Sequence, residues 1–442
     1  MSANFGLKAF NIDTAKTAGQ TQDLTGFGNG ATQIKGYFVF TTGQTGTSDT
    51  VTEVAASPFI MVGAYDGTNQ RVCVGSDSDG AGTSAAAKAT RSDSVILSVN
   101  PITAAIEGQI AHNAFITDGI QFIYTTAFAA ADASHMGAAR CHVLAWWGDA
   151  TAEVGTWTSA TATGNQTVNY ANGSLNATSI LFFSANATVD NSAAATATIS
   201  IGCADSAGNQ GVMGIRMGDG QAAATTNRYG YSGECISLMN AASAVGNRWA
   251  IVSMGTSSFT VNKLEGTLAQ LIFYVAFAGV TSLVGKTTTV TDTTTVRSIA
   301  LGKTPRGGIF LSHGTAESTQ DTADASAQWS LGAFKWDGTT LTQGSHAARS
   351  LDAADPTDDA RGLQSDGIQQ SLADSTEAFR GLMRVKQVTA AGGGTVELDN
   401  NDDADTGNNL VMYLVMGDSA SGSVVVGSST RLRNARRRRR AE

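Results

Sequence analysis

The feature that most constrains the fold of this chain is an apolar strand that is written three times. "LAWWGD" (residues 144–149), "YVAFAG" (274–279) and "YLVMGD" (413–418) are each an apolar run that ends in a glycine turn. Self-similarity at a long, fixed spacing indicates copies of one structural unit rather than unrelated segments. The sequence therefore predicts a chain built from three copies of one domain.

Four anchors recur in the same order in all three thirds of the chain, roughly 130 to 140 residues apart. They are the closing glycines Gly148, Gly279 and Gly417; the central glycines Gly63, Gly202 and Gly332; the serines Ser92, Ser232 and Ser365; and the opening strands at Tyr37, Ile180 and Gly308. The shared order supports an internal repeat.

Each third reads as a series of short strands. Apolar runs such as "SPFIMVGAYD" and "TATISIGCAD" alternate with turn-forming clusters such as "YDGTNQ" and "DSAGNQG". About seven such runs per copy, without long helical periodicity, indicate antiparallel β-sandwiches. We predict an all-β protein of three tandem antiparallel β-sandwich (jelly-roll-like) repeats with extended N- and C-terminal arms.

The anchors also set expected domain boundaries, with Thr-rich linkers that form either plain spacers or added edge strands. These are an N-terminal arm (1–33), repeat 1 (34–150), a linker (151–176), repeat 2 (177–280), a linker (281–305), repeat 3 (306–419) and a C-terminal arm with an Arg-rich tail (420–442).

Composition favours close packing over a highly charged surface. Charged residues make up 15% of the chain, against about 25% in typical domains, and 50 residues are glycine. The first residues have neither the basic nor the apolar region of a secretory signal, and no apolar run is long enough for a membrane helix. We therefore expect synthesis in the cytoplasm and no membrane partner.

No motif for a cofactor or for catalysis is present, and we expect no cofactor and no catalytic residue. His135 and His142 flank Cys141, but neighbouring residues of a strand point to opposite faces, which disfavours a shared metal ion. Acidic turns are weak candidates for Ca²⁺ because carboxylates precede a glycine, although none contains a complete binding loop and a solvated turn is favoured. The candidate residues are Asp77, Asp79, Asp219, Asp403 and Asp405.

Tryptophans offer the main candidate for ligand contact. Trp146, Trp147 and Trp249 could stack on sugar rings if they are exposed, although packing in the core is favoured.

The strongest local charge signal is the tail "RLRNARRRRRAE". Without its seven arginines and Glu442, the net charge of −9 becomes −15 for residues 1–430. A basic tail on an acidic body binds either nucleic acid or the acidic surface of another copy, and the second is favoured because no stacking aromatics accompany the arginines. The docking residues are Arg431, Arg433, Arg436, Arg437, Arg438, Arg439 and Arg440.

A Gly-, Ala- and Thr-rich, weakly charged, three-copy β chain of this kind resembles the structural proteins of tailed bacteriophage virions. The resemblance implies a non-enzymatic subunit of the tail, the baseplate or the head surface. It also implies assembly with other copies and other virion proteins through sheet edges and arms.

Two other functions stay open. One is a receptor- or glycan-binding virion module that uses the tryptophans. The other is a secreted polysaccharide-active enzyme, which would need two carboxylates beside a sugar cleft.

Overall fold

The computed structural model describes residues 2–28, 30, 33–46, 50–53, 58–78, 85–129, 136–218, 226–241, 244–290, 292, 294–320, 322–350, 360–372, 379–402 and 408–419. These residues form 33 strands and one short 3-10 turn, η2 (Ala391–Gly393). The prediction of an all-β fold is confirmed.

The strands are described in three groups of eleven, called unit 1 (β1–β11), unit 2 (β12–β22) and unit 3 (β23–β33). The strands of unit 1 are β1 Ala3–Asn11, β2 Thr21–Thr25, β3 Gly36–Thr41, β4 Thr50–Glu53, β5 Phe59–Tyr65, β6 Gln70–Ser78, β7 Ala85–Arg91, β8 Ile96–Val99, β9 Ile106–Ile116, β10 Gly119–Thr126 and β11 Arg140–Gly148. The strands of unit 2 are β12 Thr151–Thr158, β13 Gly164–Asn169, β14 Ser179–Ala187, β15 Ser192–Ala195, β16 Ala197–Asp205, β17 Gln210–Met217, β18 Thr226–Tyr231, β19 Ile236–Ala241, β20 Ala244–Met254, β21 Ser258–Glu265 and β22 Leu271–Ala278. The strands of unit 3 are β23 Val280–Thr288, β24 Arg297–Ala300, β25 Pro305–Ser312, β26 Asp324–Ala325, β27 Ala327–Trp336, β28 Leu341–Ser350, β29 Ala360–Gln364, β30 Gln369–Leu372, β31 Phe379–Thr389, β32 Thr395–Asp402 and β33 Leu410–Asp418.

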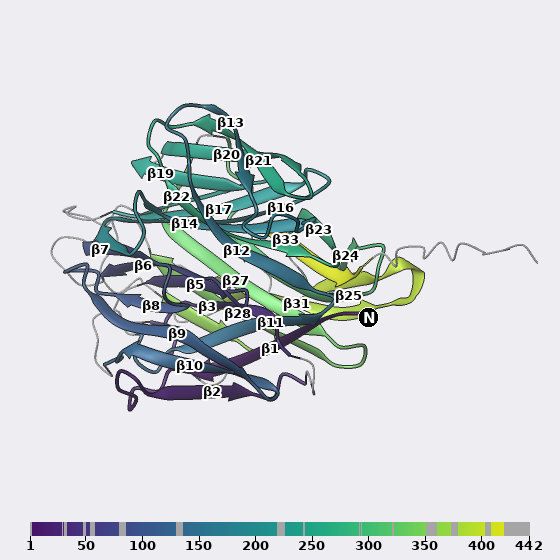
Figure 1. Ribbon diagram of the computed structural model, residues 1–442. Coiled ribbons are helices and arrows are strands. Elements are labelled where there is room, and N and C mark those ends of the chain that lie inside the picture. Colours follow the sequence, from purple (N-terminus) through teal and green to yellow (C-terminus); the bar gives the residue numbers. More distant parts are fainter. Residues whose placement is uncertain are drawn as a thin grey trace, which may run out of the picture.

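Each unit contains one large and one small antiparallel sheet. The large sheets have the orders β1-β11-β3-β5-β6-β7-β15, β12-β22-β14-β16-β17-β18-β26 and β23-β33-β25-β27-β28-β29-β4. The small sheets are β2-β10-β9-β8, β13-β21-β20-β19 and β24-β32-β31-β30. In Figure 1 the small sheets of units 1 and 2 lie at the bottom and top, with the large sheets between them.

Both faces of the central strands of each large sheet are buried, which explains the uninterrupted apolar runs of the sequence. In β14, Ile180 and Phe182 pack against the small sheet of unit 2, whereas Leu181 and Phe183 point into a core shared with the other units. Because side chains alternate along a strand, a strand covered on both sides has no polar face.

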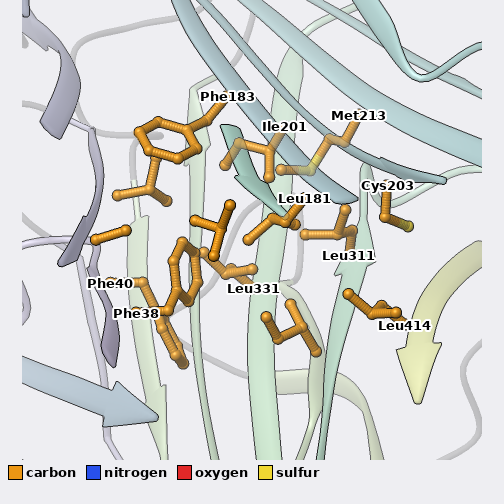
Figure 2. Packing of buried hydrophobic residues seen from close by; sticks show 14 of the residues in the cluster. Phe38, Phe40, Leu181, Phe183, Ile201, Cys203, Met213, Leu311, Leu331 and Leu414 are labelled. Carbon is orange, nitrogen blue, oxygen red and sulfur yellow. The ribbon is translucent and has the colours of Figure 1, made fainter. Parts of the chain in front are cut away.

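The shared core joins residues of all three units. It holds Phe38 and Phe40 of unit 1, Leu181 and Phe183 of unit 2, and Leu311 of unit 3, and Figure 2 shows these side chains converging. Such a core makes the folding of each unit depend on the other two.

Each large sheet ends in a strand that comes from a different unit. β15 of unit 2 pairs with β7 of unit 1, β26 of unit 3 pairs with β18 of unit 2, and β4 of unit 1 pairs with β29 of unit 3. The three exchanges close a ring. They also cover one edge of every large sheet, an edge that would otherwise present unpaired backbone groups.

The strand register matches three of the four sequence anchors. The central glycines occupy one structural position, because a Cβ on Gly63, Gly202 or Gly332 would lie 2.0, 2.3 or 2.1 Å from the carbonyl oxygen of Val95, Cys235 or Ile368. The closing anchor differs by one residue in unit 3, where the register places Asp418 rather than Gly417 at the position of Gly148 and Gly279.

The segments expected as an N-terminal arm and as linkers are integral parts of the sheets. Residues 1–33 contribute β1 and β2, which pair with β11 and β10. Residues 151–176 contribute β12 and β13, and residues 281–305 contribute β23 and β24, with equivalent partners. Their Thr-rich composition therefore belongs to outer strands of the sandwiches rather than to spacers. The C-terminal arm and its tail (420–442) lie outside the described residues.

Candidate functional site

The candidate site lies in one of three seams, where the first strand of one unit packs on the large sheet of the next. β12 packs on β6 at the seam between units 2 and 1, and β23 packs on β16 and β17 at the seam between units 3 and 2. β1 packs on β25 and β27 at the seam between units 1 and 3. Equivalent residues can therefore be compared across the three seams.

At each of two seams, an aspartate carboxylate accepts a backbone N–H from the edge of the incoming strand. The backbone N–H of Val154 donates to Asp66 Oδ2 at 2.7 Å, and the N–H of Val284 donates to Asp205 Oδ2 at 2.9 Å. Both aspartates also accept backbone N–H groups of their own hairpin turns. Each carboxylate thus satisfies a strand-edge donor and fixes the hairpin against it.

The third seam departs from this pattern because its hairpin is longer. In unit 1 the last pair of the β5–β6 hairpin is Tyr65–Gln70, two residues beyond Gly63. In unit 3 the last pair of the β27–β28 hairpin is Trp336–Leu341, four residues beyond Gly332. The register position of Asp66 and Asp205 is therefore occupied by Lys335.

The turn aspartate of unit 3, Asp337, binds groups of its own turn and Lys335, and not the incoming strand. Asp337 Oδ1 accepts the backbone N–H groups of Thr339 and Thr340, and Asp337 Oδ2 pairs with Lys335 Nζ at 2.8 Å. These hydrogen bonds oppose burial and lower the pKa of Asp337 below its usual value. A lysine ammonium has only donors, so Lys335 cannot replace the carboxylate at the strand edge.

A cavity of about 470 Å³ lies at this third seam. It is lined by Leu7, which is at the register position of Val154 and Val284, and by the cations Lys8, Arg140 and Lys335. No carboxylate is among its lining residues. The cavity therefore lies against the edge of β1 and is lined by three positively charged side chains.

A buried histidine pair lies beside the cavity. His142 Nδ1 and His346 Nε2 are 2.9 Å apart, and Thr42 Oγ1 is 3.4 Å from His346 Nδ1. Burial, with the charge of Arg140, lowers the pKa of His142 to about 3. Burial and the neighbouring His142 also hold the pKa of His346 well below its usual value, so both imidazoles are neutral at pH 7.

The acidic turns give little support to a Ca²⁺ site. Asp77 is 2% exposed, and its Oδ2 accepts a hydrogen bond from Ser350 Oγ of unit 3 at 3.4 Å. It thus lies inside the molecule rather than in a solvated turn. Within the described ranges no group of three or more His, Cys, Asp or Glu could hold a metal ion. Asp79, Asp219, Asp403 and Asp405 lie outside the described residues.

The three tryptophans do not form an exposed surface. Trp146 and Trp249 are fully buried and Trp147 is 7% exposed. Trp146 packs edge-on against Phe277 in the shared core, and Lys263 covers the ring of Trp249. Trp146 and Trp147 lie on the covered large sheet of unit 1, and Trp249 lies on the inner face of the small sheet of unit 2, so sugar stacking on them is not retained.

The histidine–cysteine segment is split between two cores. Cys141 packs in the sandwich core of unit 1, whereas His142 points to the seam, as the alternation along a strand predicts. Burial raises the pKa of the Cys141 thiol. His135 and the arginines of the tail lie outside the described residues.

Sequence reasoning missed Lys335, His346 and the cavity. The available signal was the alignment of the central glycines, because counting three residues beyond Gly63, Gly202 and Gly332 gives Asp66, Asp205 and Lys335. The change of charge in the third copy marks the seam that differs.

Comparison with known proteins adds no relative, since no family model, curated protein or solved structure matches the chain. Among the described residues, no helix is long and apolar enough to cross a membrane.

Proposed function

We propose that this chain is a non-enzymatic structural subunit of a bacteriophage virion, located in the tail or baseplate or on the head surface. It would be synthesised in the host cytoplasm and would assemble with copies of itself and with other virion proteins. The observation that carries the proposal is the cyclic exchange of β15, β26 and β4 among the three units.

The exchange supports a structural role because it makes three similar units into one interlocked body. Together with the shared core, it ties every unit to both of its neighbours. A body with approximate threefold symmetry can offer the same type of contact in three directions, which suits a place on a threefold or sixfold axis of a larger particle.

The exchange also changes the expected mode of assembly. The β1, β2, β12, β13, β23 and β24 segments pair within their own units, and β4, β15 and β26 pair between units of one chain. These strands therefore serve the body itself. We infer that contacts with other copies involve the Arg-rich tail and the acidic body, whose net charges are opposite.

Light scattering of the purified full chain at low and high salt tests the assembly. We expect species larger than one chain at low salt that dissociate at high salt, because exposed ion pairs are screened. A variant with glutamine at Arg436 to Arg440 should remain a single chain. A matched control carries five glutamines at body cations and should still assemble; its positions are Lys16, Arg91, Arg297, Lys303 and Lys386.

A single-chain mass for the unmodified protein at low salt would refute self-assembly. A retained assembly in the tail variant would assign the contact to another surface. The direct test of the particle assignment is mass spectrometry of purified tailed particles whose genome encodes this chain. The chain is expected there at a level comparable to other particle proteins, and its absence would overturn the assignment.

A glycan-binding module is less well supported, because the tryptophans on which it depended are buried.

A further inference from the structure

We propose that the cavity between units 1 and 3 binds a carboxylate, which takes the place that Asp66 and Asp205 fill at the other two seams. The inference rests on the comparison of three related seams in one molecule. It is independent of the proposed role in a virion.

The two filled seams show what this position requires. At each, an edge-strand N–H points away from its own sheet and donates to a carboxylate oxygen of the neighbouring unit, at Val154 and at Val284. Leu7 is equivalent to Val154 and Val284. Their cross-strand partners, at the same position in each unit, are Leu144, Val275 and Leu414. The strand edge at Leu7 is therefore built in the same way.

The third seam provides space and charge in place of the carboxylate. Lys335 stands at the register position of the two aspartates, and Leu7 and Lys335 both line the cavity of about 470 Å³. Lys8 of β1 and Arg140 of β11 belong to unit 1, whereas Lys335 of β27 belongs to unit 3, so the cations approach the cavity from both units. Asp337 pairs with Lys335 and offsets one of the three positive charges.

A carboxylate is the ligand group that matches these features. One of its oxygens can accept the backbone N–H at Leu7, and the others of a di- or tricarboxylate can pair with Lys8 and Arg140. Thr340 and Thr342 on the unit 3 side add hydroxyl donors. The chemistry allows two sources, which are a free organic acid and an acidic side chain of a second copy of this acidic chain.

Only one of the three seams has the lysine, so the stoichiometry is one carboxylate ligand per chain. Isothermal titration of the full chain with succinate, and separately with citrate, measures this directly. Tetramethylammonium chloride at the same ionic strength is the control for a nonspecific salt effect.

Three variants separate the site from general electrostatics. Lys8→Gln removes one cation and should weaken binding about tenfold, the effect of losing one charge-assisted hydrogen bond. Lys335→Asp should abolish binding, because it removes a cation and places a carboxylate at the position of Asp66. The matched control is Lys16→Gln, since Lys16 belongs to the same unit and does not line the cavity.

The outcomes also distinguish the two sources. Saturable 1:1 binding that follows the order of the variants supports a free acid. An absence of binding, together with a dimer that Lys8→Gln and Lys335→Asp dissociate but the tail variant does not, supports an acidic side chain of a second copy. An absence of binding, with masses that these two variants leave unchanged, overturns the proposal, as does equal weakening by Lys16→Gln.

Discussion

His142 and His346 come from β11 of unit 1 and β28 of unit 3, and their ring nitrogens meet at 2.9 Å inside the molecule. The register positions of this pair are occupied by Met412 and Met213 at the seam of units 3 and 2, and by Phe273 and Cys73 at the seam of units 2 and 1. One seam of the ring therefore contains two titratable groups where the others contain apolar side chains and a thiol.

The histidine pair predicts a loss of stability in acid. An unfolded histidine binds a proton near pH 6.5, whereas folded His142 does so only near pH 3. Between these values the unfolded chain binds more protons, so the free energy of unfolding falls as the pH decreases. The slope is about 1.4 kcal/mol per pH unit for each such histidine.

Urea denaturation of the full chain between about pH 7 and pH 4 measures this slope. The control is the double variant His142→Met/His346→Met, which copies the Met412 and Met213 seam and should lose less stability over the same range. Because the carboxylates titrate equally in both proteins, they cancel in the difference. Identical slopes would contradict the assignment.

The exchanged strand β15 predicts a position-dependent effect of proline. The N–H of Thr196 donates to Ala86 O at 2.7 Å, so the alternation of an antiparallel ladder makes Ala194 the next donor and turns the N–H of Ala193 away. Ala194→Pro should lower the free energy of unfolding by about 1–3 kcal/mol. Ala193→Pro, on the same exposed strand, is the matched control and should cost clearly less.

The central glycines predict intolerance of even one methyl group. In Gly202→Ala the new Cβ would lie 2.3 Å from Cys235 O, so the backbone where the two sheets meet must move. We expect a loss of about 1–3 kcal/mol in urea denaturation, the usual cost of overpacking. The control is Gly255→Ala, whose Cβ would lie 3.3 Å from Ser258 O; equal losses would refute the steric account.

Because the carboxylate of Glu234 is buried, we expect that replacing its partner Arg248 strongly lowers the free energy of unfolding. Glu234 is fully buried, and Arg248 NH1 lies 2.7 Å from its Oε1. Arg248→Met leaves that charge without its cation and should cost about 3–5 kcal/mol, much of which Glu234→Leu/Arg248→Met should restore. The control is Arg91→Met, because the Arg91–Asp93 pair is more exposed and should cost below about 1 kcal/mol.

The sequence indicated the sheets better than the way in which they join. The uninterrupted run "LIFYVAF" identifies β22 because seven apolar residues between turns must be buried on both sides. The position of Gly202 follows from the similar contexts "MVGA", "SIGC" and "SLGA" around the three central glycines, and the strand register agrees with it.

The exchange of strands left no readable signal. β15 is "SAAA", short and largely exposed, and its partner Thr90 lies far from Ser192 in the sequence. Neither periodicity nor propensity identifies such a pairing, because only the closure of the ring brings the two strands together. The seam with the cavity did leave one signal, the lysine at position 335 where the other copies have aspartate, but the cavity itself depends on two extra residue pairs in one hairpin.

Because the ring of exchanged strands is formed by one chain, its three sides can differ from one another. A trimer of three identical chains has no means of telling one of its sides from another, because any change to one interface appears in all three. Here a single chain specifies each interface separately, so Lys335 and the cavity beside it mark one side alone. The three sides of the body can therefore be told apart, and a neighbour that recognises the marked side binds in only one of three orientations about the axis.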